Sequence, residues 1–544
     1  MVSRSVRRLL SAATAAVLVG SIGLTGPAQA HGSSTITTPK QLTKAVTLPG
    51  VLRHLLALQL IGDLNGGNRA SGTPGHRRSA DYVAALLQHA GYQVTRQPFQ
   101  FNFCDETSSS FAQTAPVPAT YVEGTDYDLM TCSGSGDVTA AVVPVDLNLV
   151  APRVAVTSGC EAADFTATPV TGRVALMQRG GCPFGTKVAN AEAAGAVGAI
   201  VMNQGNGDPA TAPDRYSLLL GTLGAPVGIP AVGVSYATGE AFSATPGLTV
   251  HLTASTIAEV RDTENVIAES RTGKADTVVM SGAHLDSVPE GNGINDNGSG
   301  SAALLETALQ LARTKPVNKL RFAWWGAEEA NLVGSTFYVG GLTPQQQAQI
   351  KLYLNFDMVA SPNYMFGVYD GDDSAAQGSG PGPAGSAQIE KLFEAFFASR
   401  GQSTNAADFS GRSDYGPFIA AGVDIPAGGL FTGAEGIKTA ADVAKYGGVA
   451  DVAYDPCYHA ACDDLFRVVP KGGDAALYGQ LRSQYLLVGN INTFALDTNA
   501  DAIATAVVTY AFDTSSIPPR TAATAAAARS AGAATSPADG RYLQ

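Results

Sequence analysis

Imidazole and carboxylate side chains follow three apolar, β-forming runs in the second half of the chain. They are His284 and Asp286 after residues 278–280, Glu328 and Glu329 after residues 320–325, and Asp357 after residues 352–356. Such runs predict strands. In open α/β sheets, ligands bind in the crevice at the carboxyl ends of the strands. Because three predicted strands each deliver such groups to that edge, we predict a divalent-metal site there.

Two further metal-binding side chains lie in loops. Asp296 is in a turn-forming segment, residues 293–299, before a predicted buried helix, and His459 lies beside Tyr458. Taken singly, the aspartate has an alternative role as a helix cap, and a lone histidine is more often an ordinary core or surface residue. However, only two of the seven histidines lie beyond residue 260, and both fall in candidate segments. The combination is therefore much more specific than any of its members.

The charges of the candidate ligands balance two zinc ions. Asp296, Glu329 and Asp357 would offset two Zn²⁺ ions together with one bridging hydroxide, and two neutral imidazoles would add no charge. Nitrogen and oxygen ligands without thiolate are typical of catalytic zinc. Two metal ions about 3.5–4 Å apart can polarise a carbonyl group and lower the pKa of a water molecule. The ligand set thus favours two zinc ions and hydrolytic chemistry.

The composition changes along the chain and divides it into segments. At 544 residues, the chain exceeds the size of one ordinary hydrophobic core. Over residues 110–258 the charge density falls and valine-rich strands alternate with Gly, Pro and Ser turns, which predicts an inserted β-rich module. Strands separated by helices predict an α/β main domain, residues 31–109 and 259–500, with a mixed, mostly parallel sheet flanked by helices. Residues 501–544 are expected to be an Ala-rich tail, disordered or processed.

Individual elements are predicted from periodicity and turn residues. Helices are expected at residues 51–64, around 82–87 with a stop at Gly91, at 188–194 and at 299–313. Further strands are expected at residues 92–101, 173–177 and 199–202. These elements frame both the candidate metal site and the inserted module.

The first thirty residues are typical of a secretory signal peptide. Arg4, Arg7 and Arg8 precede an apolar run at residues 9–24, and Ala28-Gln29-Ala30 fits a small-x-small cleavage pattern. A membrane anchor is the alternative, but Gly and Pro soon interrupt the run. No other stretch approaches the ~20 continuous apolar residues of a spanning helix. We expect a secreted protein without a membrane anchor, by a general or twin-arginine export route.

Charge and cysteine content limit the possible partners. The net charge is −12 without a long basic run, which argues against nucleic acid as a partner. Six cysteines in an exported chain predict disulfides and allow fifteen pairings. Proximity favours 104–132, 160–182 and 457–462. The absence of any C-x-x-C pair disfavours a cysteine zinc site. We expect the protein to be a monomer.

Five short motifs contain the candidate ligands. They are His284-Leu285-Asp286-Ser287, Asn295-Asp296-Asn297-Gly298-Ser299-Gly300, Ala327-Glu328-Glu329, Asn355-Phe356-Asp357-Met358 and Cys457-Tyr458-His459. These motifs resemble those of the secreted co-catalytic zinc aminopeptidases, of the bacterial leucyl aminopeptidase and aminopeptidase Y type. Residues 66–75 are similar to the amino-terminal part of that family, and residues 179–184 to a protease-associated domain. The resemblance covers roughly residues 45–500.

The resemblance implies a role for each ligand. His284 and Asp357 would hold one zinc ion, and Glu329 and His459 would hold the other. Asp296 would bridge the two ions, and its peptide bond to the next residue would be cis.

The resemblance also implies roles for residues around the metals. Asp286 would orient His284, as second carboxylates often do for metal-bound imidazoles. Glu328 would be the general base, and Tyr458 would donate a hydrogen bond to the oxyanion. Arg412 would lie near the bound substrate, with Met358 and Phe431 lining the side-chain pocket.

The implied activity is hydrolysis of the first peptide bond of peptides and proteins, with a preference for large apolar amino-terminal residues such as leucine. One alternative is a zinc carboxypeptidase or dipeptidase on the same scaffold, which would need cationic groups to hold a substrate carboxylate. A one-zinc cyclase of related fold would not need both metal positions. A non-catalytic ectodomain would lack ligands, whereas all five are present in this chain.

Overall fold

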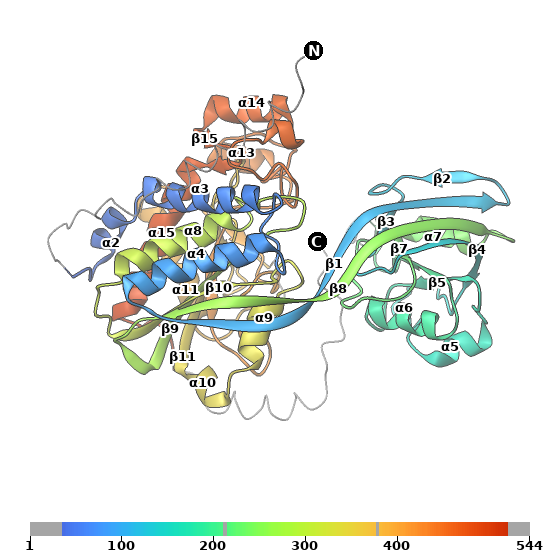
Figure 1. Ribbon diagram of the computed structural model, residues 1–544, viewed down its shortest axis with the longest axis horizontal. Helices are drawn as coiled ribbons and strands as arrows, with labels where there is room; N and C mark the ends of the chain where they lie inside the picture. The colour runs from blue at the N-terminus through green and yellow to red at the C-terminus, as the bar shows by residue number, and fades with distance from the viewer. Residues whose placement is uncertain (1–34, 210–214, 377–379, 520–544) are drawn as a thin grey trace, which may run out of the picture.

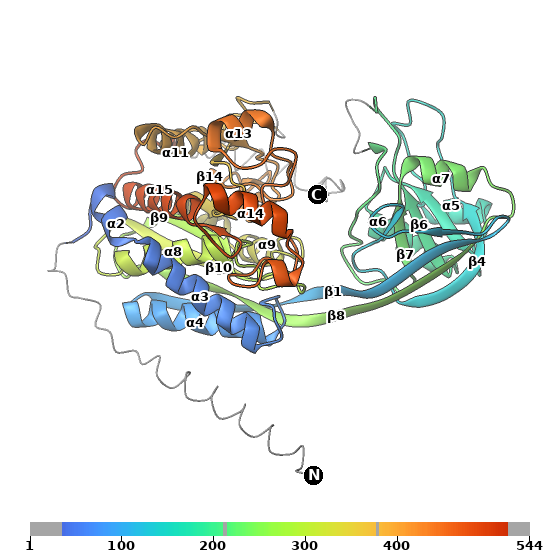
Figure 2. The ribbon, with the colours of Figure 1, turned by 90° about the horizontal axis from the view of Figure 1, so that it is seen from above.

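The computed structural model describes residues 35–209, 215–376 and 380–519 (Figure 1). The predicted signal peptide lies outside these residues. Two lobes are joined by a long ribbon of two strands, β1 (Gln93–Ala115) and β8 (Thr249–Glu269), as Figures 1 and 2 show. The larger lobe contains the chain before β1 and after β8, and the smaller lobe contains the chain between them.

A mixed sheet forms the centre of the larger lobe. Its strands beside β8 are β9 (Lys274–His284), β10 (Asn318–Trp325), β11 (Ile350–Phe356), β12 (Gly367–Tyr369), β13 (Asn405–Ala407) and β14 (Ala427–Phe431). They lie in the order β13-β12-β14-β11-β9-β10-β8. The four central strands β14, β11, β9 and β10 are parallel, whereas β8 and β12 run antiparallel to their neighbours β10 and β14. The predicted fold class is confirmed.

Helices cover both faces of this sheet. Because side chains alternate along each strand, neighbouring strand residues pack with helices on opposite faces. Val279 packs with one set of helices, and Val278 and Met280 pack with the other. The first set is α2 (Pro39–Ala45), α3 (Leu48–Leu64), α4 (Pro74–Ala90), α8 (Gly298–Leu311), α11 (Ser386–Ser399) and α15 (Thr493–Phe512). The second set includes α9 (Val333–Gly340) and α12 (Gly416–Ile419). The remaining elements are α10 (Pro344–Gln349), α13 (Ala440–Tyr446), η2 (Val469–Lys471), α14 (Ala475–Gln484), β15 (Leu487–Val488) and β16 (Ile491–Asn492).

Local sequence explains where the helices begin and end. The Thr73 side chain accepts a hydrogen bond at the start of α4, Pro74 occupies its first position, and Gly91 ends it in a left-handed conformation with φ 103°. Asn297 caps α8 in the same manner by accepting from the Gly300 amide. Twelve of the fourteen α8 residues are buried, so this helix fixes the loop before it against the sheet.

The smaller lobe is the predicted β-rich insert. Its elements are β2 (Ala119–Tyr121), β3 (Tyr127–Leu129), β4 (Gly136–Pro144), α5 (Ala162–Ala167), β5 (Val174–Gln178), α6 (Phe184–Ala193), β6 (Gly198–Met202), β7 (Ala231–Val234) and α7 (Tyr236–Ser243). Two of the three disulfides, Cys104–Cys132 and Cys160–Cys182, lie in or beside this lobe. The third is Cys457–Cys462, so all three predicted pairings are confirmed.

Three predicted boundaries differ from the structure. The expected ends of the insert, at residues 110 and 258, fall inside β1 and β8, because both strands continue from one lobe into the other. The expected tail from residue 501 is wrong for its first part. The helix α15 runs on to Phe512 with most of its residues buried, and Ile517 is 2% exposed in the main core. Residues 520–544 lie outside the described part of the chain.

Within the described residues, no single helix has the length and apolar character to cross a membrane. The bent pair of α2 and α3 meets the criteria of length and composition only when the two helices are taken together.

Candidate metal centre

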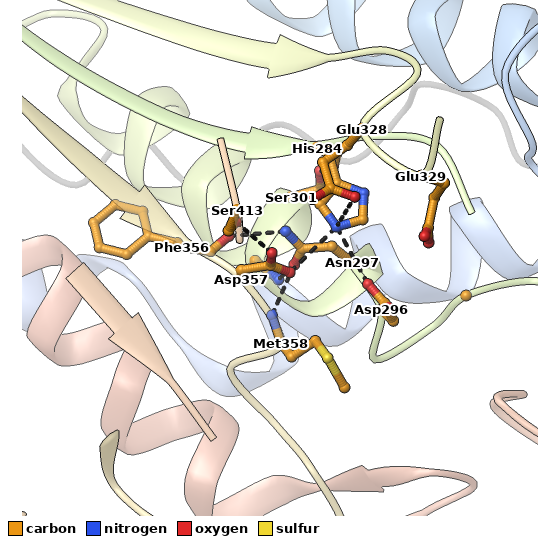
Figure 3. A network of polar contacts seen from close by, with 12 residues as sticks. His284, Asp296, Asn297, Ser301, Glu328, Glu329, Phe356, Asp357, Met358 and Ser413 are labelled. Atoms are coloured by element: carbon orange, nitrogen blue, oxygen red, sulfur yellow. Dashed lines mark hydrogen bonds and ion pairs between the residues drawn. The ribbon is translucent and has the colours of Figure 1, made fainter. Parts of the chain in front are cut away.

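The carboxyl ends of three parallel strands bring the predicted ligands together. His284 is the last residue of β9, Asp357 directly follows β11, and two residues separate the end of β10 from the Glu328–Glu329 pair. Asp296 comes from the loop before α8. Figure 3 shows His284, Asp296 and Asp357 pointing toward one another.

Asp296 lies between two imidazole rings. Its Oδ1 is 3.2 Å from Nε2 of His284, and its Oδ2 is 3.4 Å from Nε2 of His459. The first imidazole also lies 3.2 Å from Oδ1 of Asp357, and the second lies 3.0 Å from Oε2 of Glu329. Two triads therefore share one carboxylate, and within each triad the candidate ligand atoms lie within 4.8 Å of one another.

The chemistry of these donors fits metal ions. Three carboxylates and two imidazoles are nitrogen and oxygen ligands of the kind that catalytic zinc uses. Oε1 of Glu329 is buried and has no hydrogen-bond partner within the described residues. Burial raises the pKa of Glu329 to about 7, and repulsion from Asp296 adds to the rise. A cation between these groups would remove both the repulsion and the unpaired oxygen.

Glu328 lies at the edge of the ligand cluster. Its Oε2 is 3.9 Å from Nε2 of His284, and its side chain is 11% exposed. Burial raises the pKa of Glu328 well above its usual range; His284 opposes the rise, whereas Glu329 and Asp414 add to it. The residue is thus a carboxylate with raised proton affinity beside the predicted ligands.

Asp286 was expected to orient His284 through its carboxylate, but its backbone carbonyl lies closer to the imidazole. The Nδ1 atom of His284 is 3.2 Å from the backbone carbonyl oxygen of Asp286 and 3.7 Å from its carboxylate. The carboxylate Oδ1 instead accepts a hydrogen bond of 3.3 Å from the amide of Glu328. Asp286 therefore connects the β9 ligand with the turn that carries the predicted base.

The loop that presents Asp296 is fixed by buried polar groups. The peptide bond between Asp296 and Asn297 is cis, as the resemblance implied. The Asp463 carboxylate accepts hydrogen bonds of 2.9 Å from the amides of Asn295 and Asp296. On the other side, the Asn297 side chain donates to the carbonyl of Phe356 at 2.9 Å. The loop is thus tied to the β11 end as well as to the segment after His459.

A cavity of about 90 Å³ opens beside the cluster. All five predicted metal ligands line it, with the predicted base and the remaining predicted residues Met358, Arg412, Phe431 and Tyr458. Asp286 is the predicted site residue that does not line it. Arg412 forms an ion pair of 3.0 Å with Glu435 at the rim, and the ring of Tyr458 stacks on His459 with centroids 3.8 Å apart.

Sequence reasoning missed several buried groups that support the site. Ser413 donates a hydrogen bond of 2.5 Å to Oδ2 of Asp357. Arg69 is fully buried and donates to the backbone carbonyls of Leu285, Asn292 and Gly293. Arg69 lies in residues 66–75, which carried the family resemblance, and Ser413 directly follows the predicted residue Arg412, but neither signal revealed these contacts. Asp463 had no sequence signal beyond its place next to the Cys457–Cys462 bridge.

The sheet, the ligand triads at its carboxyl edge and the inserted β-rich lobe together define a metal-dependent hydrolase. Residues 265–478 match peptidase family M28, and residues 139–242 match the PA domain. An aminopeptidase of Pseudomonas aeruginosa is 48% identical over 474 residues, which are 86% of this chain and 82% of that protein.

Leucine aminopeptidase 2 of Trichophyton rubrum is 37% identical over 489 residues, 89% of this chain and 88% of that protein. The solved aminopeptidase of Aneurinibacillus sp. strain AM-1 has the same fold, with a TM-score of 0.63, 24% identity, and coverage of 89% of this chain and 98% of that chain. The chain therefore belongs to peptidase family M28 and carries a PA domain.

Proposed function

We propose that this zinc aminopeptidase binds two zinc ions in the triads that share Asp296. His284 and Asp357 would hold one ion, and Glu329 and His459 the other. The supporting observation is that the two oxygens of Asp296 face different imidazoles, at 3.2 and 3.4 Å. The three ligand carboxylates would leave one positive charge of the two zinc ions uncompensated. A bound hydroxide would neutralise that charge.

Within this proposal, Glu328 is the general base and then the general acid. The zinc ions would polarise the scissile carbonyl group and lower the pKa of the attacking water. Glu328 accepts a proton from that water and later delivers it to the leaving amine. Burial raises the pKa of Glu328 above its usual range, and this higher proton affinity suits a group that must accept a proton and return it.

Tyr458 and Arg412 line the same cavity. In the proposal, the Tyr458 hydroxyl donates a hydrogen bond to the oxyanion that forms on the carbonyl oxygen. Burial, with the nearby Asp296 and Glu329 carboxylates, raises the pKa of Tyr458 above its usual range. The hydroxyl therefore keeps its proton and remains a donor across the working pH range.

The cavity favours a substrate amine over a substrate carboxylate. Arg412 is the single lysine or arginine among the described residues that line it, and it is paired with Glu435. Glu328 and Asp408 also line the cavity and are not zinc ligands in the proposal, so their carboxylates supply the negative charge that an ammonium group requires. A carboxypeptidase would need unpaired cations at this place.

Met358 and Phe431 give the cavity apolar surface. We therefore propose that leucine and other large apolar amino-terminal residues bind best, which accords with the leucine aminopeptidase among the relatives. Export is proposed on the disulfides, which persist in oxidising compartments. The monomeric state and the exact roles of the site residues stay predictions.

The matched pair Glu328→Gln and Glu329→Gln tests the proposal. The first variant should keep two zinc ions per chain and lose about 10²–10⁴-fold in kcat, the usual contribution of a general base. The second should lose affinity for one zinc ion. Metal analysis with kinetics on a leucyl chromogenic amide reports both effects. The assignment is wrong if the two variants exchange these properties, or if active wild-type protein holds fewer than about two zinc ions.

A further inference from the structure

The turn that carries Glu328 has an unfavourable backbone conformation that contacts from other segments must stabilise. Residues 326–334, here called the base loop, comprise the connection from β10 to α9 and the first two residues of α9. Three of its residues that are not glycine have positive φ: Ala327 at 53°, Asn331 at 76° and Leu332 at 58°. L residues rarely adopt this conformation unless surrounding contacts impose it. The contacts that impose it therefore decide where the Glu328 side chain lies.

Asn265 on β8 bonds to both ends of the base loop. Its Oδ1 accepts a hydrogen bond of 3.0 Å from the amide of Gly326, and its Nδ2 donates one of 2.9 Å to the carbonyl of Gly334. The Nδ2 atom also donates to Oε1 of Gln97 on β1 at 3.0 Å. Asn265 is fully buried, so water does not compete for these bonds. One amide group thus fixes the distance between the first and the last residue of the loop.

The backbone at Gly334 packs tightly against the Asn265 side-chain amide and against Gly326. A Cβ atom at Gly334 would lie 2.5 Å from Oδ1 of Asn265 and 2.1 Å from the Gly326 carbonyl oxygen. The loop ends therefore approach each other and the amide as closely as glycine permits. This packing is specific to the present loop conformation.

Ser71 holds the loop next to the base itself. Its Oγ accepts a hydrogen bond of 2.6 Å from the amide of Ala327, the residue before Glu328. Thr263, two residues before Asn265 on β8, donates to the same Oγ at 3.2 Å. Asp286 accepts from the next amide, that of Glu328. Three consecutive amides of the base loop are therefore each bound by a side chain from a different segment.

We propose that Asn265 and Ser71 are positioning residues for Glu328. They do not line the cavity that holds the predicted ligands, so they act through the base loop alone. They hold Ala327 in its left-handed conformation, and this directs the following carboxylate toward His284 and the substrate. The inference rests on the proposed role of Glu328 as the general base.

The variants Asn265→Ala and Ser71→Ala test the inference, with Asn318→Ala as the matched control. Asn318 is buried at the opposite end of β10, where its side chain donates 2.9 Å to the carbonyl of Tyr510. A misplacement of about 1 Å can cost about 10²-fold in rate. We expect kcat to fall at least about tenfold in the two test variants, with KM and zinc content retained. Asn318→Ala should lower the melting temperature and keep kcat.

A double-mutant cycle separates positioning from general stability. In a Glu328→Ala background, Asn265→Ala should cause no further loss of kcat, because the residue that it positions is absent. A further loss equal to that in the wild-type background would overturn the inference. So would an unchanged kcat in Ser71→Ala and Asn265→Ala, or a loss that saturating zinc restores.

One further variant, together with the Glu328→Gln variant described above, separates the remaining outcomes. If Asn265→Ala does not fold, Asn265→Asp keeps the acceptor for Gly326 and removes the donor to Gly334, and the same loss of kcat at constant zinc content is expected. Full activity of Glu328→Gln would instead refute the proposed base. An inactive Glu328→Gln beside fully active Asn265 and Ser71 variants refutes only the positioning role.

Discussion

The Cys457–Cys462 bridge encloses two residues of the candidate site, and its removal tests what it contributes. Between the cysteines lie Tyr458 and His459, whose rings stack, and His459 has a left-handed backbone with φ 53°. Both cysteines are buried, and the hydroxyl of Tyr478 donates to Sγ of Cys457 at 3.2 Å. We expect the double variant Cys457→Ala/Cys462→Ala to show a large decrease in kcat/KM and only a small decrease in melting temperature.

The small loss of stability follows from the length of the closed loop. A separation of 5 residues gives about 2 kcal/mol in the chain-entropy model, whereas the 22-residue separation of Cys160–Cys182 gives about 3.4 kcal/mol. A change of about 1 kcal/mol shifts the melting temperature of a domain of 150–250 residues by roughly 2–4 °C. The loss for Cys457–Cys462 should therefore be only a few degrees, since the main domain is larger still.

The loss of activity follows from position. Without the bridge, His459 can relax from its left-handed conformation and move away from Glu329 and Asp296. A displacement of about 1 Å at a reacting group can cost about 10²-fold in rate. We expect kcat/KM to fall by about tenfold or more, together with weaker binding of one zinc ion.

The matched control is Cys160→Ala/Cys182→Ala in the PA domain. It should show the larger decrease in melting temperature and an unchanged kcat. Calorimetry, zinc titration and kinetics on a leucyl amide measure these quantities for both variants. A Cys457/Cys462 variant that is strongly destabilised yet fully active with both zinc ions bound would contradict this expectation.

Three other predictions concern the substrate, the loop before α8 and a buried carboxyl group. Acetylation of a peptide's amino terminus should nearly abolish cleavage, because it removes the cation that the lining carboxylates attract; trimming from the carboxyl end at a comparable rate would refute the aminopeptidase direction. Arg69→Met should destabilise the protein by about 3–5 kcal/mol, since it leaves three buried backbone carbonyls without a hydrogen-bond donor; an unchanged melting temperature would contradict this. Burial, with repulsion from Asp372 and Asp370, raises the pKa of Glu390 to about 7 from 4.5. This group therefore stabilises the fold fully below pH 4.5, and its contribution is lost as the pH rises through 7. Glu390→Gln should be more stable than wild type at pH 8, by at most about 3 kcal/mol, and should lose that advantage near pH 5; equal differences at both pH values, measured by denaturant unfolding, would contradict the assignment.

The candidate ligands could be predicted from sequence because their chemistry and their place both follow local rules. His284, Glu329 and Asp357 follow runs that form parallel strands, and such strands present their carboxyl ends at one edge. Nothing local places Asn265 against Gly326, 61 residues later, because that contact depends on the register of β8 and β10. The same holds for Asp463, whose contacts with Asn295 and Asp296 span 168 and 167 residues.

The ends of the inserted lobe and of the main domain could not be predicted from composition, because they depend on which side chains pack in the folded structure. The middle of β1 carries Asp105, Glu106 and serines that are exposed or half-buried, a composition more typical of a loop than of a strand. The last turns of α15 contain alanines and threonines that resemble the low-complexity tail. In the structure these small side chains pack closely against α2, α8 and α11.

The ribbon also has a consequence for the order of folding. β1 and β8 pair from Ala115 with Thr249, in the smaller lobe, to Gln93 with Glu269, beside β10. Closing the second pair directly would require a loop of well over a hundred residues, with the entropy that such a loop loses. If the PA domain folds first, it brings the two strands together at its own end. The ladder can then extend one residue pair at a time toward the main sheet, with no large loop left to close. In this order of events the PA domain would serve as the turn of a very long hairpin, and β8 would reach the main sheet already paired.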